Sequence, residues 1–128
     1  MQDKPESHEL LTAIADFLMK EVMPAVREND ALAYKTLVSW NMLGVIAREI
    51  KQEDTALDSE ALRLEKLTGK KSPESRSQKR AWVKEQTAAL SREIRDKKLC
   101  DPESEIWLHV KSTLSEKLAT ANPRFAQD

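Results

Sequence analysis

The residues best suited to chemistry are few and lie far apart in the chain. His8 and His109 are the only histidines, and Cys100 is the only cysteine. Neither histidine has a serine or cysteine nucleophile beside it in a recognisable motif, and the charge of Asp101 disfavours a thiolate at Cys100. Two distant histidines and one cysteine do not make a zinc pattern. We therefore expect no catalytic residue, no bound metal and no cofactor.

The chain also lacks the usual machinery for handling phosphate. Gly44 and Gly69 are its only glycines, so neither common kind of glycine-rich phosphate loop is present. The sequence has no kinase-type catalytic Asp loop followed by a metal-binding Asp. We do not expect this chain to bind and transfer phosphate unaided.

Charge is distributed unevenly, although the formal net charge is only −1. Residues 1–30 hold seven acidic and three basic side chains, whereas residues 63–98 hold twelve basic and five acidic ones. The densest basic cluster consists of Lys70, Lys71, Arg76, Lys79, Arg80 and Lys84. This pattern predicts a solvated face, or a docking patch for a ligand phosphate or an acidic partner. We expect no nucleic-acid binding, because a DNA-reading domain is normally more basic as a whole.

Polar side chains interrupt two of the apolar stripes. Asn41 and Arg48 are seven residues apart and share one face of an expected helix, and Glu21 lies on the inward stripe of the preceding helix. Because a buried charge needs a partner, we predict that Glu21 pairs with Arg48 and that Asn41 bonds to backbone or to a neighbour. This polar clamp would fix the helix register, or it would form a polar site facing a ligand or partner.

Three tryptophans are a large number for a small helical protein. Trp82 and Trp107 fall on inner stripes and are predicted to lie in the core. Trp40 lies at the edge of an apolar arc, where an exposed Trp often anchors a partner. We therefore include Trp40 among the candidate contact residues.

Length and composition indicate the class of protein that must position these side chains. The 128 residues fit one domain, and the chain is 40% hydrophobic and 34% charged. A lone cysteine excludes an internal disulfide and suits a reducing compartment. The acidic N-terminus lacks the apolar stretch of a signal peptide, and no apolar run is long enough for a membrane span. These features predict a cytoplasmic protein that does not enter membranes.

Apolar residues at helical spacing predict an all-α compact bundle of about five amphipathic helices within a single domain, residues 1–128. The expected helices cover about Ser7 to Pro24, Asp30 to Gln52, Thr55 to Thr68, Gln78 to Lys98, and Pro102 up to Asn122-Pro123. Pro24 should kink the first helix, and the second, apolar nearly all round, should be central or contribute to an oligomer interface. Residues 70–77 are predicted to form a mobile loop, and residues 121–128 a tail.

Several segments are similar to a known family. They are the opening MQDKPESHELL, FLMKEVMPAV, VSWNMLGVIAREI, LSREIRDKKL, DPESEIWLHV and the C-terminal KLATANPRF. On these segments the chain resembles an uncharacterised family of short bacterial all-helical proteins. The segment from about residue 54 to 79 matches weakly, so the basic cluster is outside the strongest part of the resemblance.

Members of that family are typically encoded beside a kinase of the aminoglycoside-phosphotransferase fold and an acyl-CoA dehydrogenase. The resemblance implies a non-catalytic small subunit that helps the kinase phosphorylate a hydroxyacyl-CoA in short-chain hydroxy-acid breakdown. Candidate partner or anion contacts are then Trp40, Lys79, Arg80, Lys84, Arg124 and Phe125. The alternative is a stand-alone helical module, either a monomer or a homodimer, that binds another protein or an anionic ligand.

Overall fold

The computed structural model describes residues 3–125, and within that range every regular element is a helix. The predicted all-α class is therefore confirmed. Contacts divide the chain into two compact units, which we call the hairpin unit (residues 1–53 and 120–122) and the three-helix unit (residues 54–119 and 123–128). That residues 1–128 fold as one domain in a compact bundle stays a prediction.

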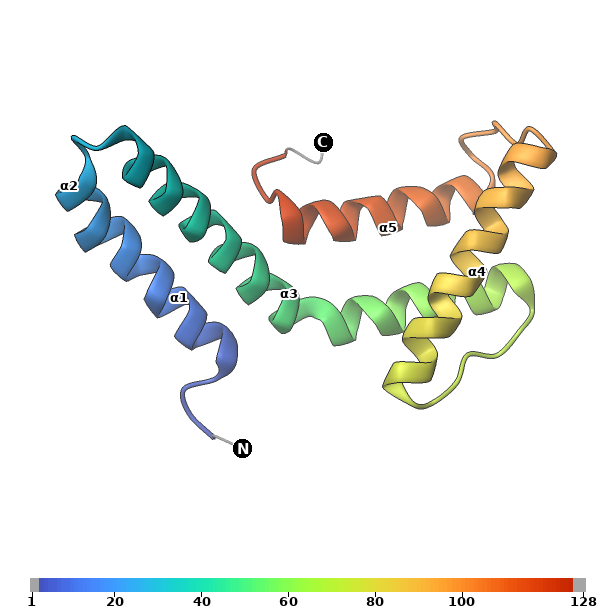
Figure 1. Ribbon diagram of the computed structural model, residues 1–128. Coiled ribbons are helices and arrows are strands. Elements are labelled where there is room, and N and C mark those ends of the chain that lie inside the picture. Colours follow the sequence, from blue (N-terminus) through green and yellow to red (C-terminus); the bar gives the residue numbers. More distant parts are fainter. Residues whose placement is uncertain (1–2, 126–128) are drawn as a thin grey trace. The chain divides into compact units, whose positions relative to one another are not determined.

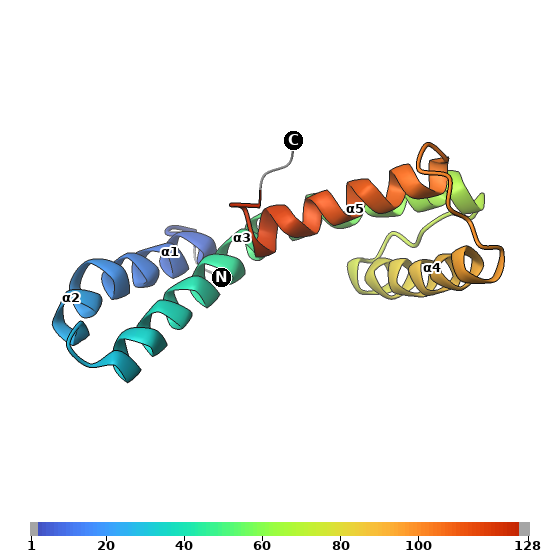
Figure 2. The same cartoon turned by 90° about the horizontal axis from the view of Figure 1, so that it is seen from above.

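The hairpin unit is an antiparallel pair of helical segments. Its elements are α1 (Ser7–Phe17), the π-helix η1 (Leu18–Val22), α2 (Met23–Val26) and the first part of α3 (Asp30–Thr68). The segment from α1 to α2 runs alongside the beginning of α3 (Figures 1 and 2). Asn29 starts α3 where the sequence predicts, because its side-chain oxygen accepts a hydrogen bond from the Leu32 N–H at 3.1 Å.

Pro24 disturbs the first helix as predicted, but the irregularity lies in the turn that precedes it. The backbone N–H of Met23 bonds to the carbonyl of Leu18, five residues back, which is the spacing of a π-helix. Pro24 has no N–H to donate to the preceding turn, so a regular α-helical ladder cannot pass through it. The chain regains α-helical form from Met23 to Val26 before it turns into α3.

The second and third predicted helices are a single helix, so the expected number of five is wrong. α3 runs without a break for 39 residues, which corresponds to about 58 Å at the α-helical rise. Asp54 and Thr55, at the expected break between the two helices, are residue types that favour N-caps. Neither residue prevents a helix from continuing, and the sequence places no glycine or proline between Val45 and Thr68.

The hairpin closes through a narrow stripe of mostly small residues. Ala15 of α1 and Thr36 and Ala47 of α3 are its buried residues. Trp40 and Leu43 share the inner side of α3 with them and are half-buried. Such a stripe covers only one side of each helix, so most of the larger apolar side chains of this unit lie outside it.

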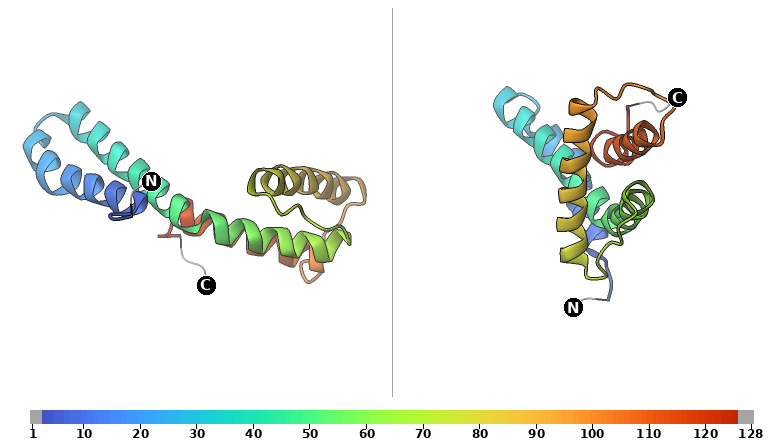
Figure 3. Two further views of the ribbon diagram at one scale, coloured as in Figure 1. Left: turned by 90° about the horizontal axis from the view of Figure 1, so that it is seen from below. Right: turned by 90° about the vertical axis from the view of Figure 1, so that its right-hand side faces the viewer.

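The three-helix unit holds the main hydrophobic core. The C-terminal part of α3 packs against α4 (Arg76–Asp96), which crosses it, and α5 (Glu105–Ala121) completes the unit (Figure 3). Its buried apolar side chains are Leu57, Ala61, Leu64, Val83 and Leu90, with Leu67, Trp82, Ile94 and Ile106 packed against them. The helical spacing of the apolar residues places all of these on inner stripes; it also places Ala89 and Leu114 there, but both are exposed.

Helix ends follow local chemistry. Gly69 adopts a positive φ of 71° and ends α3, as its position in the sequence predicts. α5 begins three residues later than predicted, because Ser104 rather than Asp101 caps it: the Ser104 hydroxyl accepts from the Trp107 N–H at 3.4 Å. Asp101 instead closes the preceding turn by accepting from the Glu103 N–H.

The segment between α3 and α4 is held by hydrogen bonds to α3. The Glu65 carboxylate accepts from the backbone N–H of Ser72 at 2.9 Å and from its hydroxyl at 2.6 Å. These bonds hold the pKa of Glu65 below its usual value. The predicted loop over residues 70–77 is therefore tied to α3 at its centre and becomes helical from Arg76.

The C-terminal segment leaves α5 at Ala121, so Asn122-Pro123 ends the helix as predicted. Residues 126–128 of the expected tail lie outside the described residues. No helix between residues 3 and 125 combines the length and the apolar character needed to cross a membrane.

Candidate functional site

The predicted polar clamp is not formed. Glu21 and Asn41 are exposed, and no ion pair between Glu21 and Arg48 is formed within residues 3–125. Arg48 instead donates from Nε to the carbonyl oxygen of Thr120 at 2.8 Å. The buried stripe of α3 passes through Thr36 and Ala47, so Asn41 and Arg48 do not face α1.

Gly44 makes room for this use of Arg48. A Cβ atom at position 44 would lie 3.2 Å from Nη1 of Arg48, closer than ordinary van der Waals contact. The glycine therefore allows the guanidinium to lie against α3 and reach the last turn of α5. Gln52 adds a second bond at the same place, accepting from the Thr120 hydroxyl at 3.2 Å.

The hairpin unit exposes an extensive set of large apolar side chains, which we call the hairpin surface. Its members are 37% to 68% exposed: Leu10, Ile14, Phe17, Leu32, Tyr34, Leu37, Val38, Met42, Ile46 and Ile50. On α1, Leu10, Ile14 and Phe17 follow the i, i+4, i+7 spacing of one helical face. On α3, Tyr34, Val38 and Met42 repeat every four residues on the side away from α1.

The basic cluster is partly neutralised by α3. Arg76 lies 3.3 Å and Lys79 2.8 Å from the same carboxylate oxygen of Asp58. The hydrogen bond from Lys79 and the charge of Arg76 hold the pKa of Asp58 below its usual value. Lys79 therefore serves the α3–α4 contact, and anion contacts at the exposed side chains of Arg80 and Lys84 stay predictions.

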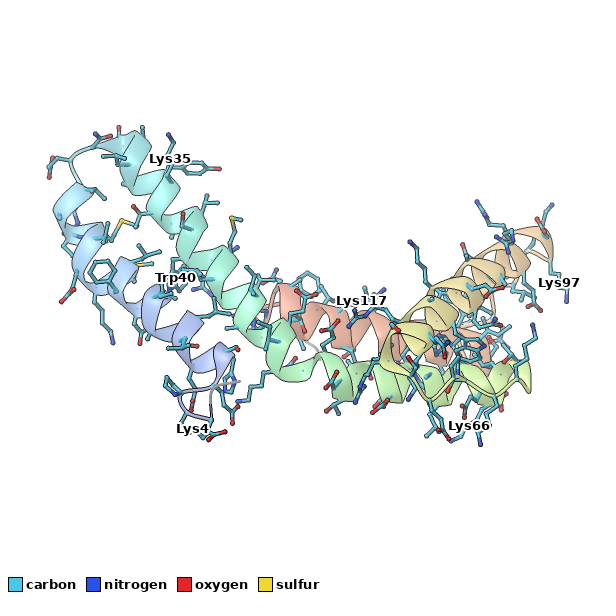
Figure 4. The ribbon with its side chains drawn as sticks, turned by 60° about the horizontal axis from the view of Figure 1, so that its bottom comes forward. Lys4, Lys35, Trp40, Lys66, Lys97 and Lys117 are labelled. Atoms are coloured by element: carbon cyan, nitrogen blue, oxygen red, sulfur yellow. The ribbon has the colours of Figure 1, made fainter. Side chains whose placement is uncertain are left out.

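The other predicted partner contacts are Trp40 on α3 and the pair Arg124 and Phe125 near the C-terminus. Trp40 lies half-buried on the side of α3 toward α1 (Figure 4), so it contributes to the closure of the hairpin. Arg124 and Phe125 are exposed beyond the end of α5. Partner contacts at these three residues stay predictions.

A groove with a volume of about 410 Å³ opens on the three-helix unit. Its walls are the apolar side chains of Leu90 and Ile94 on α4 and of Trp107, Val110 and Leu114 on α5. Its polar groups are Glu60, Thr87, Ser91, Arg95, His109, Thr113 and Lys117. This size and mixture are typical of a small-molecule pocket, which combines apolar walls with a few convergent polar groups.

A partly buried hydrogen-bond network joins α3 to α5 in the three-helix unit. Arg63 on α3 forms two parallel bonds to the Glu116 carboxylate, at 2.9 and 2.8 Å, and a third to the Thr113 hydroxyl at 3.2 Å. Its Nε donates to Nδ1 of His109 at 3.3 Å. Sequence reasoning missed this network, although His109, Thr113 and Glu116 share a face of α5 at i, i+4, i+7 and so provided a signal.

Two titratable groups of the groove have shifted pKa values. Burial and the neighbouring Arg63 charge lower the pKa of His109, and burial raises the pKa of Glu60. His109 is therefore neutral near pH 7, with Nδ1 engaged as an acceptor. This arrangement favours hydrogen-bond donation from the other ring nitrogen over proton abstraction. Within residues 3–125, no His, Cys, Asp and Glu side chains gather in a group that could hold a metal.

Fold and surface together define an all-α protein with an exposed apolar hairpin and a grooved three-helix unit. Residues 24–125 match the family model described as a domain of unknown function, DUF6285, and the chain belongs to that family. The match includes the whole groove and begins after α1. No curated protein and no solved structure was found to match the chain.

Proposed function

We propose that this chain is a non-catalytic small subunit that binds a larger protein through the hairpin surface. The observation that carries this proposal is the exposure of ten large apolar side chains on one helical hairpin. Extended apolar patches of this kind are uncommon on monomeric proteins and mark interfaces. Covering them would remove apolar area from water, which is the dominant favourable term in most protein association.

The partner we propose is the kinase of the aminoglycoside-phosphotransferase fold that the family resemblance implies. In that role the chain would assist phosphorylation of a hydroxyacyl-CoA by the kinase. The charge of the hairpin adds a requirement for the partner: residues 1–30 carry seven acids and three bases. The surface that receives the hairpin should therefore be apolar at its centre and basic at its rim.

The direct test is co-expression of the chain with that kinase, followed by measurement of the mass of the complex in solution. Met42→Glu places a charge on the hairpin surface at a residue that is 57% exposed. Leu62→Glu is a matched control, because Leu62 is 56% exposed on the same helix but belongs to the three-helix unit. We expect a stoichiometric complex with the wild type and with Leu62→Glu, and at least a tenfold loss of affinity with Met42→Glu.

The kinase assay supplies a second readout. Turnover of a hydroxyacyl-CoA by the kinase should rise when the wild-type chain is added, and it should rise less with Met42→Glu. Absence of any complex, or equal binding by both variants, would overturn the proposal. Turnover of the substrate by the isolated chain would also overturn it.

The second candidate is a homodimer through the same surface. The opposite charges of residues 1–30 and residues 63–98 favour it, since the acidic hairpin of one copy is complementary to the basic segment of another. Light scattering of the purified chain distinguishes the two candidates. A stable dimer that Met42→Glu converts to a monomer, without any kinase complex, would support the homodimer.

A further inference from the structure

We infer that the groove of the three-helix unit is a binding site for a small aliphatic monocarboxylate. This inference is independent of the hairpin surface, because every residue that lines the groove belongs to the three-helix unit. It rests on three features of the groove: its apolar walls, hydrogen-bonding groups without protein partners, and an excess of positive charge.

The apolar walls fit a hydrocarbon body. Leu90 and Ile94 from α4 and Val110 and Leu114 from α5 line the groove, together with Trp107. Trp107 is fixed by donation from Nε1 to the carbonyl oxygen of Leu99 at 3.0 Å. Each methylene that enters such a groove removes apolar area from water and so favours binding. An aliphatic chain therefore gains more there than a polar molecule of equal size.

The hydrogen-bonding groups of the groove point to an oxygen acceptor on the ligand. His109 is only 5% exposed. Because Arg63 donates to Nδ1, the imidazole proton is on Nε2, for which the structure gives no acceptor within residues 3–125. The Thr87 hydroxyl is the buried side-chain polar atom that has no hydrogen-bond partner within residues 3–125. Buried polar groups normally have partners, so the unpartnered Thr87 hydroxyl, in the same groove as a donor on His109, indicates a ligand that supplies oxygen atoms.

The charges of the groove favour an anion. Arg95 and Lys117 are cationic, His109 is neutral, and Glu60 is the only acidic residue of the lining. Figure 4 shows Lys117 on α5. A carboxylate group is attracted by both cations and accepts from His109 and Thr87, whereas an amine would meet two like charges and two donors. Glu60 opposes an anion, so replacement of its carboxylate by an amide should strengthen binding.

The experiment titrates the full chain with octanoate, followed by NMR chemical shifts and calorimetry. We expect saturable binding to the wild type and at least tenfold weaker binding of 1-octanol, which has the same body without the charge. Leu114→Glu places a carboxylate in the groove at a residue that is 55% exposed, so folding should persist. It should weaken octanoate binding at least tenfold, while the matched control Leu62→Glu should retain wild-type affinity.

Two further variants separate recognition from structure. Thr87→Val removes the unpartnered hydroxyl with little change of shape, so it should stabilise the fold and yet weaken octanoate binding several-fold. Glu60→Gln should tighten binding about threefold or more. No saturation by the wild type, equal binding of 1-octanol, or equal effects of Leu114→Glu and Leu62→Glu would each overturn the inference. None of these outcomes depends on the kinase complex, so the two proposals fail separately.

Discussion

Arg63 and His109 are joined by a hydrogen bond of 3.3 Å from the guanidinium Nε to the imidazole Nδ1. Arginine has no acceptor and remains protonated, so Nδ1 must be the unprotonated nitrogen of a neutral ring. One contact between α3 and α5 thus fixes both the tautomer and the charge of a buried histidine. The same guanidinium binds Glu116 in bidentate fashion, which keeps Arg63 in place.

The stability of the fold should decrease at mildly acidic pH because of His109. Its pKa is lowered in the folded protein by burial and by Arg63, with an opposing effect of Glu116. As the pH falls through the ordinary value of about 6.5, the unfolded chain takes up a proton that the folded chain resists. Stability should therefore be constant with respect to this group above that pH and decline below it. Urea unfolding at about pH 7.5 and pH 5.5 measures the change.

The control for this prediction is His109→Gln, which keeps a hydrogen-bond acceptor but does not titrate. The variant is expected to be less stable at neutral pH, and its stability should fall less between the two pH values. If wild type and variant lose equal stability on acidification, His109 is not the group responsible.

Replacement of Arg63 by Lys should destabilise the three-helix unit by about 1–3 kcal/mol, because lysine cannot form the paired bonds to Glu116 and also reach His109. Arg92→Lys, on the exposed part of α4, serves as the control and should change stability by less than about 0.5 kcal/mol. A double-mutant cycle with Glu116→Gln should show a coupling of at least about 0.5 kcal/mol. Additive effects of the two substitutions would contradict the network.

Two residues with left-handed backbone should respond in opposite directions to substitution. Gly69 has φ 71°, and nothing lies within 4 Å of a Cβ added there, so Gly69→Ala tests backbone strain alone. The substitution should lower the free energy of unfolding by about 1–2 kcal/mol. Lys98 has φ 50° at the end of α4, where the Leu99 N–H reaches back to the Ile94 carbonyl. Lys98→Gly relieves that strain and should raise the free energy of unfolding by about 0.5–1 kcal/mol. Thermal melts that shift both variants in the same direction would be inconsistent with these conformations.

Local sequence signals predicted the features that depend on neighbours in the chain. Leu57, Leu64 and Leu90 lie in the core as their spacing indicates. Gly69 marks the end of α3 because glycine readily adopts the left-handed backbone conformation, and Pro123 marks the end of α5 because proline has no backbone N–H. Such signals do not depend on which helix packs against which.

Which side chains are exposed and which are paired depends on tertiary packing. These features were therefore predicted less well than the core and the helix ends. Glu21 was placed on an inward stripe by counting through a regular helix, but the π-helix changes the register in that turn. Leu114 has the spacing of a core residue, yet it is exposed in the groove. Arg63 lies 46 to 53 positions before its hydrogen-bond partners on α5 in the sequence. The helical spacing of those partners can be recognised in the sequence, but their contact with Arg63 cannot.

The continuity of α3 at Thr55 can be tested by comparing Thr55→Ala with Thr55→Gly. Thr55 is exposed and lies within the helix from Asp30 to Thr68. In a helix interior, alanine is more stable than glycine by about 1 kcal/mol. At an N-cap the order is reversed, since glycine there is tolerated better than alanine. Urea unfolding that ranks Thr55→Ala above Thr55→Gly supports one continuous helix, whereas the opposite ranking would restore the two helices that the sequence suggested.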